Sequence, residues 1–368
     1  MERPGRPARR GRGALDNPSP RFEQQRYVES DDGWNTIEEQ PPELSTIVQA
    51  ELTRSILSTN ASPDVPFSQS INPYRGCEHG CVYCFARPSH AYLGLSPGLD
   101  FETRIFSKPQ AAELLRKELS KKGYRPQVIA LGANTDPYQP VEQRLGITRE
   151  LLTVLLEFQH PVSIITKSAG IRRDLDLLSE LAQRQLVSVY LSITSLDPQL
   201  ARRMEPRAAA PALRLRTLKE LSDSGVPVGV LASPIIPALN DRELESILTA
   251  ARAQGASHAG YILLRLPGEV QQLFSNWLRH HYPGRADKVL SLLKDSHDGA
   301  LYRSEFGTRM KGSGPWAEAL RRRFQIAARR LGLEQPGHQL ELQHFAVPAA
   351  QSPQLCLFER SQPTVCQR

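Results

Sequence analysis

Residues 72–84 have the sequence NPYRGCEHGCVYC, which contains three of the five cysteines in the chain. Gly76 and Gly80 lie beside these cysteines, and glycine permits tight turns that are closed to other residues. Thiolates at such a spacing can wrap one compact soft-metal centre. The next cysteine is Cys356, so the loop offers three ligands and leaves one coordination position open, which usually indicates chemistry at the metal. The predicted metal ligands are Cys77, Cys81 and Cys84, in a C-x3-C-x2-C pattern.

Two other interpretations of the three cysteines are open. A zinc site could be completed by His79 or His90, although the ligand pairs of zinc sites are normally separated by a longer loop. The cysteines could also be unrelated buried side chains, but cysteines that serve only as small hydrophobic core residues have no reason to recur with glycines between them.

The composition excludes several classes of protein. The chain has 368 residues, of which 40% are hydrophobic, and no apolar run approaches the roughly 18 to 20 residues of a bilayer span. Residues 1–21 are rich in Arg, Pro and Gly and lack the apolar segment of a secretory signal. Five cysteines are too few for a disulfide scaffold, and their clustering favours a reducing compartment. We therefore expect a cytoplasmic protein that does not contact a membrane.

Between polar ends, short apolar runs alternate with helical patterns. Such runs suit buried parallel strands, and consecutive strand–helix units predict an α/β fold with a parallel sheet, either doubly wound or curled toward a barrel. Composition does not separate these two. We expect Ser107 to cap the first helix, which ends at Gly123, and Thr148 to cap the second. The expected strands are 70–74, 127–132, 162–166, 186–193, 226–232 and 259–264, and the later helices are 149–158, 174–184, 211–222 and 242–253.

The ends of the chain differ from its centre in composition. We expect residues 1–45 to form a flexible or draped polar arm, residues 46–270 the α/β core, residues 271–335 a basic helical extension and residues 336–368 a tail. In the tail, the alternation of Leu340, Leu342 and Phe345 could add a short strand.

The net charge of +7 is unevenly distributed. The first 44 residues carry −2, because a basic stretch and an acidic stretch partly cancel, whereas residues 271–332 carry +7. Five arginines between 321 and 330 surround Phe324 and Ile326, which predicts a helix with one apolar stripe and a basic face. A solvated surface and a phosphate-contacting surface have the same composition, so both interpretations are open.

The cysteine segment resembles the radical S-adenosylmethionine superfamily, whose signature is C-x3-C-x2-C with an aromatic residue, here Tyr83, before the last cysteine. The runs GANTDPYQPVE at 132–142, ITKS at 165–168, MEPR at 204–207 and PIIPALND at 234–241 are similar to the branch that contains spore photoproduct lyase and uncharacterised relatives. The resemblance implies a partial (β/α)6 barrel. It also implies a [4Fe-4S] cluster that reductively cleaves S-adenosylmethionine to a 5′-deoxyadenosyl radical.

The resemblance also implies roles for individual residues. Asn134, Thr135 and Asp136 occupy the place where the superfamily holds the methionine amino group, and Lys167 is placed to pair with the methionine carboxylate. Ser192 could bind the ribose or the carboxylate, or could be a strand serine satisfied by backbone. Tyr83 is expected beside the adenine.

The catalytic residues are not identified by this resemblance. Spore photoproduct lyase returns a hydrogen atom through a core cysteine thiol, but this chain has no cysteine between Cys84 and Cys356. Cys356 or Cys366 could reach the site only if the tail folded back over it; otherwise a tyrosine such as Tyr138 is a candidate donor, or the reaction needs no thiol donor. Glu205 and Arg207 are further candidates, or could form an ion pair that shapes their loop.

The leading functional prediction is a radical enzyme that abstracts hydrogen from a nucleic-acid or other phosphate-bearing substrate, with a reductant such as flavodoxin or ferredoxin as partner. A second interpretation is an iron–sulfur protein that binds DNA or RNA or transfers electrons without radical chemistry. A third is a radical enzyme that acts on a protein or a small molecule, with the basic segment merely solvated.

Overall fold

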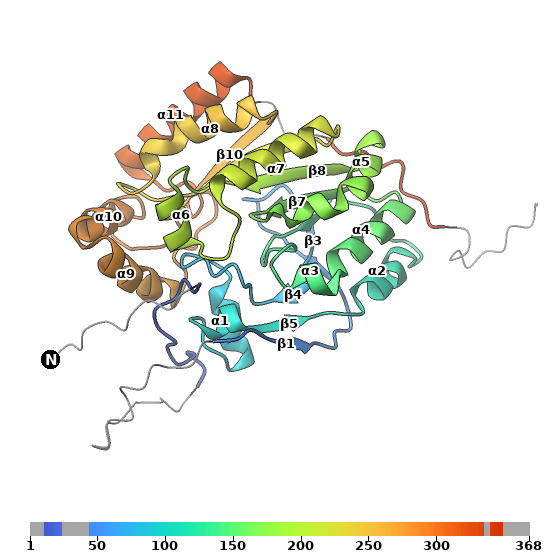
Figure 1. The fold of residues 1–368 in the computed structure, drawn as a ribbon, viewed down its shortest axis with the longest axis horizontal. Coiled ribbons are helices and arrows are strands. Elements are labelled where there is room, and N and C mark those ends of the chain that lie inside the picture. The colour runs from blue at the N-terminus through green and yellow to red at the C-terminus, as the bar shows by residue number, and fades with distance from the viewer. Residues whose placement is uncertain (1–10, 24–43, 335–338, 349–368) are drawn as a thin grey trace, which may run out of the picture.

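The computed structural model describes residues 11–23, 44–334 and 339–348 (Figure 1). Its main sheet has the strand order β10-β9-β8-β7-β6-β3-β2, in which every neighbouring pair is parallel except the antiparallel edge pair β2 and β3. The six parallel strands follow one another in chain order, as predicted for six strand–helix units. The strands are β2 Leu57–Thr59, β3 Gln69–Ile71, β6 Ile129–Leu131, β7 Val162–Thr166, β8 Val187–Ser192, β9 Val228–Ile235 and β10 His258–Leu263.

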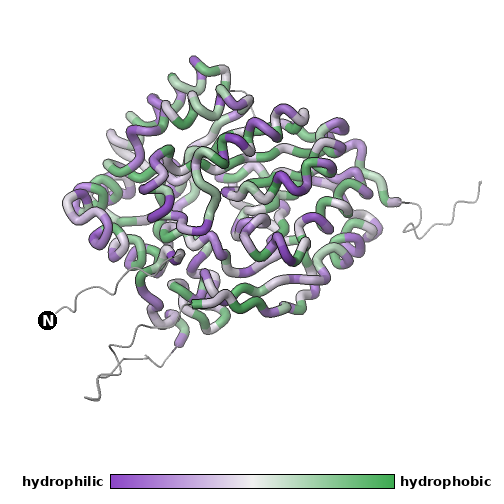
Figure 2. The backbone as a smooth tube through the Cα atoms, in the orientation of Figure 1, coloured by the Kyte–Doolittle hydropathy of each residue, from purple (hydrophilic) through white to green (hydrophobic). Residues whose placement is uncertain are grey.

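Helices follow the strands and pack side by side along the sheet, α2 against α4, α4 against α5, and α7 against α8. Figure 2 shows the strands as mainly hydrophobic and the helices as mixed, because each helix turns one apolar face to the sheet. These are α2 Ala111–Leu119, α3 Glu142–Leu145, α4 Ile147–Glu157, α5 Leu175–Gln183, α6 Pro198–Met204, α7 Pro211–Asp223 and α8 Leu244–Ala253; the 3-10 turns η3 Ala169–Asp174 and η4 Asp241–Glu243 precede α5 and α8.

Two of the predicted helix caps are wrong. Ser107 is the last residue of a strand, and the N-cap of α2 is Gln110. Thr148 lies inside α4, whose N-cap is Gly146, and its hydroxyl donates to the Pro137 carbonyl oxygen at 2.6 Å. Ser107 instead pairs with Ala50 and Tyr74 in a sheet, and the Thr148 hydroxyl bonds to a carbonyl oxygen outside the first turn of its helix.

A second, three-stranded sheet lies beside the main one, in the order β1-β5-β4. It brings the residues before the cysteine loop, β4, against β5 and thereby supports that loop. The elements of this region are β1 Ile47–Ala50, β4 Tyr74–Arg75, the 3-10 helix η2 Arg87–Leu93, α1 Asp100–Thr103 and β5 Arg104–Ser107.

Three helices follow the last strand: α9 Val270–His281, α10 Pro283–Asp295 and α11 Gly314–Leu331. The predicted apolar stripe of α11 is only partly right, because Phe324 packs against Tyr261 but Ile326 is 70% exposed. Residues 339–348 contain no strand, so the predicted tail strand is not formed there. None of the described helices has an apolar stretch of the length that a bilayer crossing needs.

The segment between α10 and α11 joins the two edges of the main sheet. The Met310 carbonyl oxygen accepts from the Leu263 amide on β10 at 2.8 Å. Next to it, the Arg309 guanidinium donates to the Asp64 carboxylate, between β2 and β3, at 2.5 Å. This bridge closes the side on which β10 and β2 do not pair with each other.

Candidate active site

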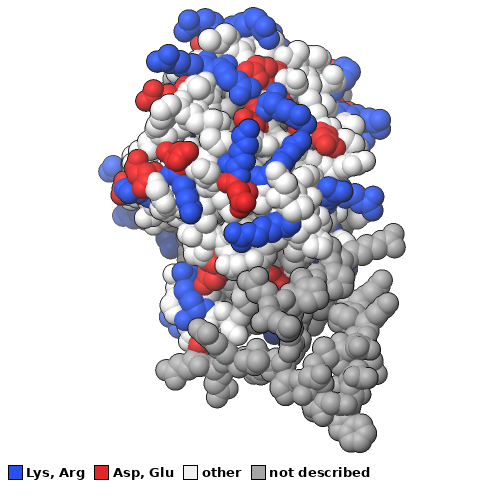
Figure 3. All heavy atoms as spheres, turned by 90° about the vertical axis from the view of Figure 1, so that its left-hand side faces the viewer, with Lys and Arg blue, Asp and Glu red and all other residues white. Residues whose placement is uncertain are grey.

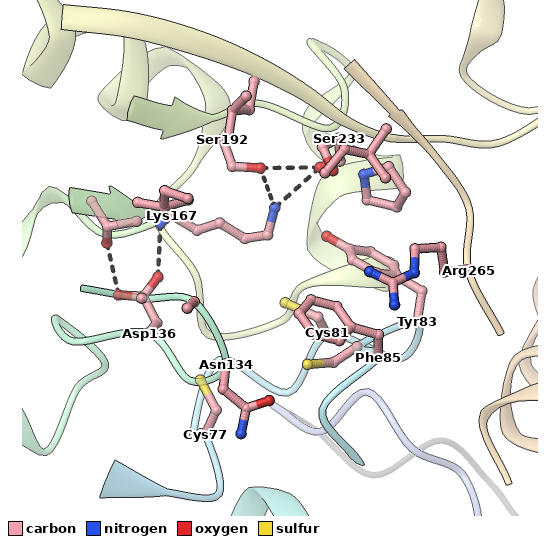
Figure 4. A pocket seen from close by; sticks show the side chains of 18 of the residues that line it. Cys77, Cys81, Tyr83, Phe85, Asn134, Asp136, Lys167, Ser192, Ser233 and Arg265 are labelled. Carbon is pink, nitrogen blue, oxygen red and sulfur yellow. Dashed lines mark hydrogen bonds between the residues drawn. The ribbon is translucent and has the colours of Figure 1, made fainter. Parts of the chain in front are cut away.

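A pocket of about 220 Å³ lies where the parallel strands end and the cysteine loop begins (Figure 4). Barrel chemistry is expected at this edge, because loops from several parallel strands converge there. Among the lining residues are all three cysteines of the loop and polar groups that follow β6, β7 and β8. The predicted site residues that line it are Cys77, Cys81, Tyr83, Cys84, Asn134, Asp136, Lys167 and Ser192.

The cysteine loop is shaped by two glycines with left-handed backbone. Gly76 has φ +77° and Gly80 has φ +67°, which β-carbons disfavour. A Cβ at Gly76 would also lie 2.9 Å from the Phe101 carbonyl oxygen. Burial raises the pKa of all three loop thiols. Without a metal the thiols are therefore neutral at pH 7, and metal binding must displace their protons.

The residues fit a cluster better than a single ion. In the described part of the chain, no three His, Cys, Asp or Glu side chains are placed to hold one metal ion. The two histidines of the zinc interpretation have other partners: His79 Nδ1 lies 3.3 Å from Asp136, and His90 Nε2 lies 2.9 Å from the Arg104 carbonyl oxygen. An iron–sulfur cluster takes each thiolate at a different iron, which three separated thiols around one pocket can satisfy.

An N-terminal segment packs against the back of the cysteine loop. The Gly13 and Ala14 amides donate to the buried Glu102 carboxylate at 3.0 and 2.8 Å, and Arg87 donates to the same carboxylate at 2.5 Å. A Cβ at Gly13 would lie 1.8 Å from the Gly80 carbonyl oxygen. Residues 12–18, which belong to the segment expected as an arm, thus pack against residues 96–102, and Gly13 also lies against Gly80 of the loop. Residues 1–10 and 24–43 lie outside the described ranges.

Asp136 organises one end of the pocket. Its carboxylate accepts from the Thr166 hydroxyl and the Lys167 amide, each at 2.7 Å, and lies beside His79. Burial would raise the pKa of Asp136, but His79 and these hydrogen bonds lower it, so the carboxylate is ionised. Asn134 lines the same end of the pocket, with its backbone amide bonded to Asn72 Oδ1 at 3.1 Å.

Thr135 faces away from this end. Its buried hydroxyl donates to the Tyr74 carbonyl oxygen at 2.8 Å. Of the three residues predicted to hold the methionine amino group, the structure therefore brings Asn134 and Asp136 to the pocket and leaves Thr135 in the packing behind it.

Lys167 is the centre of a buried polar network. Its ammonium donates to Ser192 Oγ at 2.5 Å and to the Ser233 carbonyl oxygen at 3.2 Å, and lies 3.4 Å from the Glu205 carboxylate. Ser192 Oγ donates to the same carbonyl oxygen at 3.0 Å, so this strand serine is satisfied by backbone, one of the two interpretations left open. An ammonium has three N–H groups, and protein acceptors surround all of them.

The same network contains the carboxylate of Glu205. It is fully buried and receives hydrogen bonds from Tyr83, Thr194 and Arg214. Burial would raise the pKa of Glu205, but the Arg214 and Lys167 cations and these hydrogen bonds hold it at about 2. The sequence analysis did not single out Arg214, which lies in the first turn of α7, because arginine is an ordinary helix former.

Two predictions about catalytic candidates are corrected by the contacts. Glu205 and Arg207 do not pair, because Arg207 lies 3.1 Å from Glu78 instead. Tyr138 is buried outside the pocket, and its hydroxyl donates to Asp174 at 3.1 Å. Neither Tyr138 nor Arg207 lines the pocket, and Glu205 contributes to it through Lys167 and Tyr83.

Sequence reasoning missed Arg265, which follows β10 and lies across the pocket from Asp136 (Figure 4). Its guanidinium lies over the Phe85 ring, 4.8 Å from the centroid. The sequence does contain a signal for it, because Arg265 is a single charge between apolar residues and comes directly after the predicted strand 259–264.

Comparison with known proteins agrees with this architecture. Residues 71–251 match the radical SAM superfamily. The chain belongs to the radical S-adenosylmethionine superfamily. It is therefore a radical S-adenosylmethionine enzyme, and the superfamily implies a [4Fe-4S] cluster and S-adenosylmethionine as cofactors.

Related sequences are themselves uncharacterised. The uncharacterized protein Rv2578c of Mycobacterium tuberculosis H37Rv is 38% identical over 232 residues, which cover 62% of this chain and 68% of that protein. The uncharacterized protein MJ0683 of Methanocaldococcus jannaschii is 29% identical over 174 residues, covering 47% of this chain and 62% of that protein.

Solved structures of spore photoproduct lyase share the fold. One complexed with dinucleoside spore photoproduct has a TM-score of 0.57 at 14% identity, and covers 77% of this chain and 79% of that one. A variant with bound AdoMet and the same dinucleoside has a TM-score of 0.56 at 14% identity, with the same coverage. The fold class predicted from sequence, a partial (β/α)6 barrel of the radical SAM type, is thereby confirmed.

Proposed function

We propose that this radical S-adenosylmethionine enzyme abstracts a hydrogen atom from a nucleic-acid substrate bound in the pocket. The observation that carries the proposal is the convergence of three loop thiols and the polar groups of three strand ends on one cavity. The similarity in fold to spore photoproduct lyase complexed with dinucleoside spore photoproduct supports the choice of substrate class.

The proposal assigns separate tasks to the residues around the cavity. Cys77, Cys81 and Cys84 would hold the cluster, which with S-adenosylmethionine supplies a 5′-deoxyadenosyl radical after one electron from a reductant such as flavodoxin or ferredoxin. Asn134 would accept from the methionine amino group, and Asp136 would hold the Asn134 loop in place through its contacts to β7.

The network around Glu205 would fix the other wall. Tyr83 precedes the last loop cysteine, and its hydroxyl is tied to Glu205, so its ring is held at the pocket before any ligand arrives. Lys167 would reach the methionine carboxylate by exchanging one of its protein acceptors, most simply the more distant Glu205 oxygen at 3.4 Å.

We propose that hydrogen return does not use a separate thiol of the described pocket. Among the described residues the cysteines are Cys77, Cys81 and Cys84, all assigned to the cluster. Cys356 and Cys366 lie outside the described residues. The part of the pocket that the structure describes therefore offers no separate thiol, and we propose a reaction other than thiol-dependent dimer repair.

On the face that Figure 3 shows, exposed Lys and Arg are spread among fewer Asp and Glu, and on α6, α9 and α10 the exposed cations exceed the exposed acids. Such a surface can contact several phosphates at once and supports the nucleic-acid proposal. The exposed cations on these helices are Arg202, Arg203, Arg279, Arg285, Lys288 and Lys294.

Deuterium transfer tests the proposal without knowledge of the exact substrate. The reconstituted enzyme would be reduced anaerobically with S-adenosylmethionine and with perdeuterated DNA, RNA or protein prepared from cells grown in deuterated medium. We expect 5′-deoxyadenosine that carries one deuterium with DNA or RNA. Label from protein alone, or unlabelled 5′-deoxyadenosine with both nucleic acids, would contradict the proposed substrate class.

A further inference from the structure

Arg265 carries an incomplete set of contacts. Its Nε is buried and makes no hydrogen bond, and its guanidinium is stacked on Phe85. No carboxylate among the described residues forms an ion pair with it. A buried donor without a partner costs free energy, so such a group is retained where a ligand satisfies it.

The other charges at the pocket are compensated within the protein. Lys167 is surrounded by Ser192, Ser233 and Glu205, and Asp136 by Thr166, His79 and the Lys167 amide. Near Arg265, the Asp64 carboxylate accepts from the Gly307 amide at 2.7 Å and from Arg309 at 2.5 Å. Asp64 is also close enough to Arg265 for the two charges to interact, but its hydrogen bonds go to Gly307 and Arg309, so Arg265 has no ion-pair partner of its own among the described pocket residues.

Arg265 also lies away from the end assigned to the methionine part of the cofactor. Asn134 and Asp136 follow β6, whereas Arg265 follows β10, and β7, β8 and β9 separate these strands in the sheet. In Figure 4, Arg265 and Phe85 lie on the opposite side of the pocket from Asp136. Because the methionine amino and carboxylate groups chelate the same iron, an anion at Arg265 belongs to a different molecule.

Apolar side chains also line the pocket that contains Arg265. They come from the bridge between α10 and α11, from the loop before β3, from β10 and from the residue after the cysteine loop, and a ligand could place a flat or apolar part against them. Phe85 is 41% exposed, which leaves part of its ring accessible. These lining residues are Val65, Phe67, Phe85, Leu263 and Met310.

We propose that Arg265 binds a phosphodiester of the substrate strand. This inference rests on the proposed nucleic-acid substrate and adds the residue that recognises it. A guanidinium presents paired N–H groups that match two phosphate oxygens, and stacking on Phe85 holds its plane in place for that contact. The contact places the sugar and base next to the cluster loop, where hydrogen abstraction occurs.

A binding cycle tests this contact. The oxidised holoenzyme with S-adenosylmethionine would be titrated with a fluorescein-labelled thymidine tetranucleotide and with its uncharged methylphosphonate analogue, in the native protein and in Arg265→Gln. We expect Arg265→Gln to weaken binding of the phosphodiester by roughly 10- to 100-fold and to have little effect on the analogue. The matched control is Arg125→Gln, which removes an exposed charge before β6, at the far ends of the strands.

The outcomes separate this inference from the proposed function. Equal weakening of both ligands by Arg265→Gln would show that the contact is not to phosphate and would overturn the inference. Unchanged binding with Arg265→Gln would also overturn it, while deuterium transfer from nucleic acid would leave the proposed function standing. Weaker binding of S-adenosylmethionine itself in Arg265→Gln, measured by equilibrium dialysis, would assign the anion to the cofactor and contradict the substrate contact.

Discussion

The two cations of the pocket have opposite surroundings. Lys167 donates to protein acceptors on three sides and belongs to a buried network with Glu205 and Arg214. Arg265 has a buried Nε without a hydrogen-bond partner and forms no ion pair with a carboxylate among the described residues. The cation at one end of the pocket thus has all its hydrogen-bond partners before a ligand binds, whereas the cation at the other end lacks one.

This difference separates stability from recognition. A fully satisfied buried network fixes side-chain positions, and its members are costly to remove singly because each leaves another charge unpaired. An unsatisfied group contributes little to folding and gains its partner on binding. Substitutions at the Glu205 end should therefore change stability, and substitutions at Arg265 should change ligand affinity.

The largest expected effect is at Glu205. In Glu205→Gln the fully buried Arg214 guanidinium loses its counter-charge, and we expect the free energy of unfolding to fall by about 3–5 kcal/mol. Urea unfolding under anaerobic conditions measures this. The matched control is Glu220→Gln, which breaks the exposed pair with Arg172 and should cost less than about 1 kcal/mol. Equal losses in the two variants would contradict the comparison.

Acid should weaken the same network. The pKa of Glu205 is about 2 in the folded protein, against an ordinary value of 4.5, so the unfolded chain takes up this proton first as the pH falls. The ionised Glu205 carboxylate stabilises the folded state fully above about pH 4.5. This stabilisation is lost as the pH falls through about 2, which lowers the free energy of unfolding by an amount on the order of 3 kcal/mol. The free energy of unfolding, measured across this pH range, should depend less steeply on pH in Glu205→Gln than in the native chain. An equal pH dependence in the two proteins would show that Glu205 is not the titrating group.

A smaller effect is expected at Lys167. Lys167→Met removes one cation from Glu205 but leaves Arg214 in place, so we expect a loss of about 1–3 kcal/mol in the free energy of unfolding. The same urea titration checks it. A loss as large as that of Glu205→Gln would mean that Lys167, and not Arg214, is the main partner of the carboxylate.

The smallest effect on stability is expected at Arg265. Removing a guanidinium that has no hydrogen-bond partner at Nε should not lower the free energy of unfolding by more than about 0.5 kcal/mol in Arg265→Gln, and relief of the unpaired donor can raise it. Destabilisation above about 2 kcal/mol would show that Arg265 is a structural residue and would remove the contrast with Lys167.

Sequence pattern predicted the central fold well, because most of its strands are near-continuous apolar runs whose side chains are buried or partly buried. The expected strand at 162–166 is β7 itself, and the expected helix at 211–222 differs from α7 by one residue. The cysteines and the strand-end residues Asn134, Asp136, Lys167 and Ser192 were brought to one pocket, because parallel strands end at a common edge.

The features that pattern missed depend on contacts between distant segments. Strand β5 forms through its pairing with β1 and β4, and Ser107 joins that strand instead of capping a helix. The N-terminal contact to Glu102 spans almost ninety residues, and polar composition gave no sign of it. Glu205 pairs with Arg214 and Lys167 instead of its near neighbour Arg207, because the buried cations face it from other elements.

Electron–nuclear double resonance of the reduced holoenzyme tests most directly whether the cysteine pocket binds S-adenosylmethionine at the open iron, separately from Arg265. S-adenosylmethionine labelled with ¹⁵N at the amino group and ¹⁷O at the carboxylate would be added to the native protein and to Arg265→Gln. We predict hyperfine coupling of both labels to the cluster in the two proteins. A filled cluster without coupling in the native protein, or coupling that is lost in Arg265→Gln, would contradict the account.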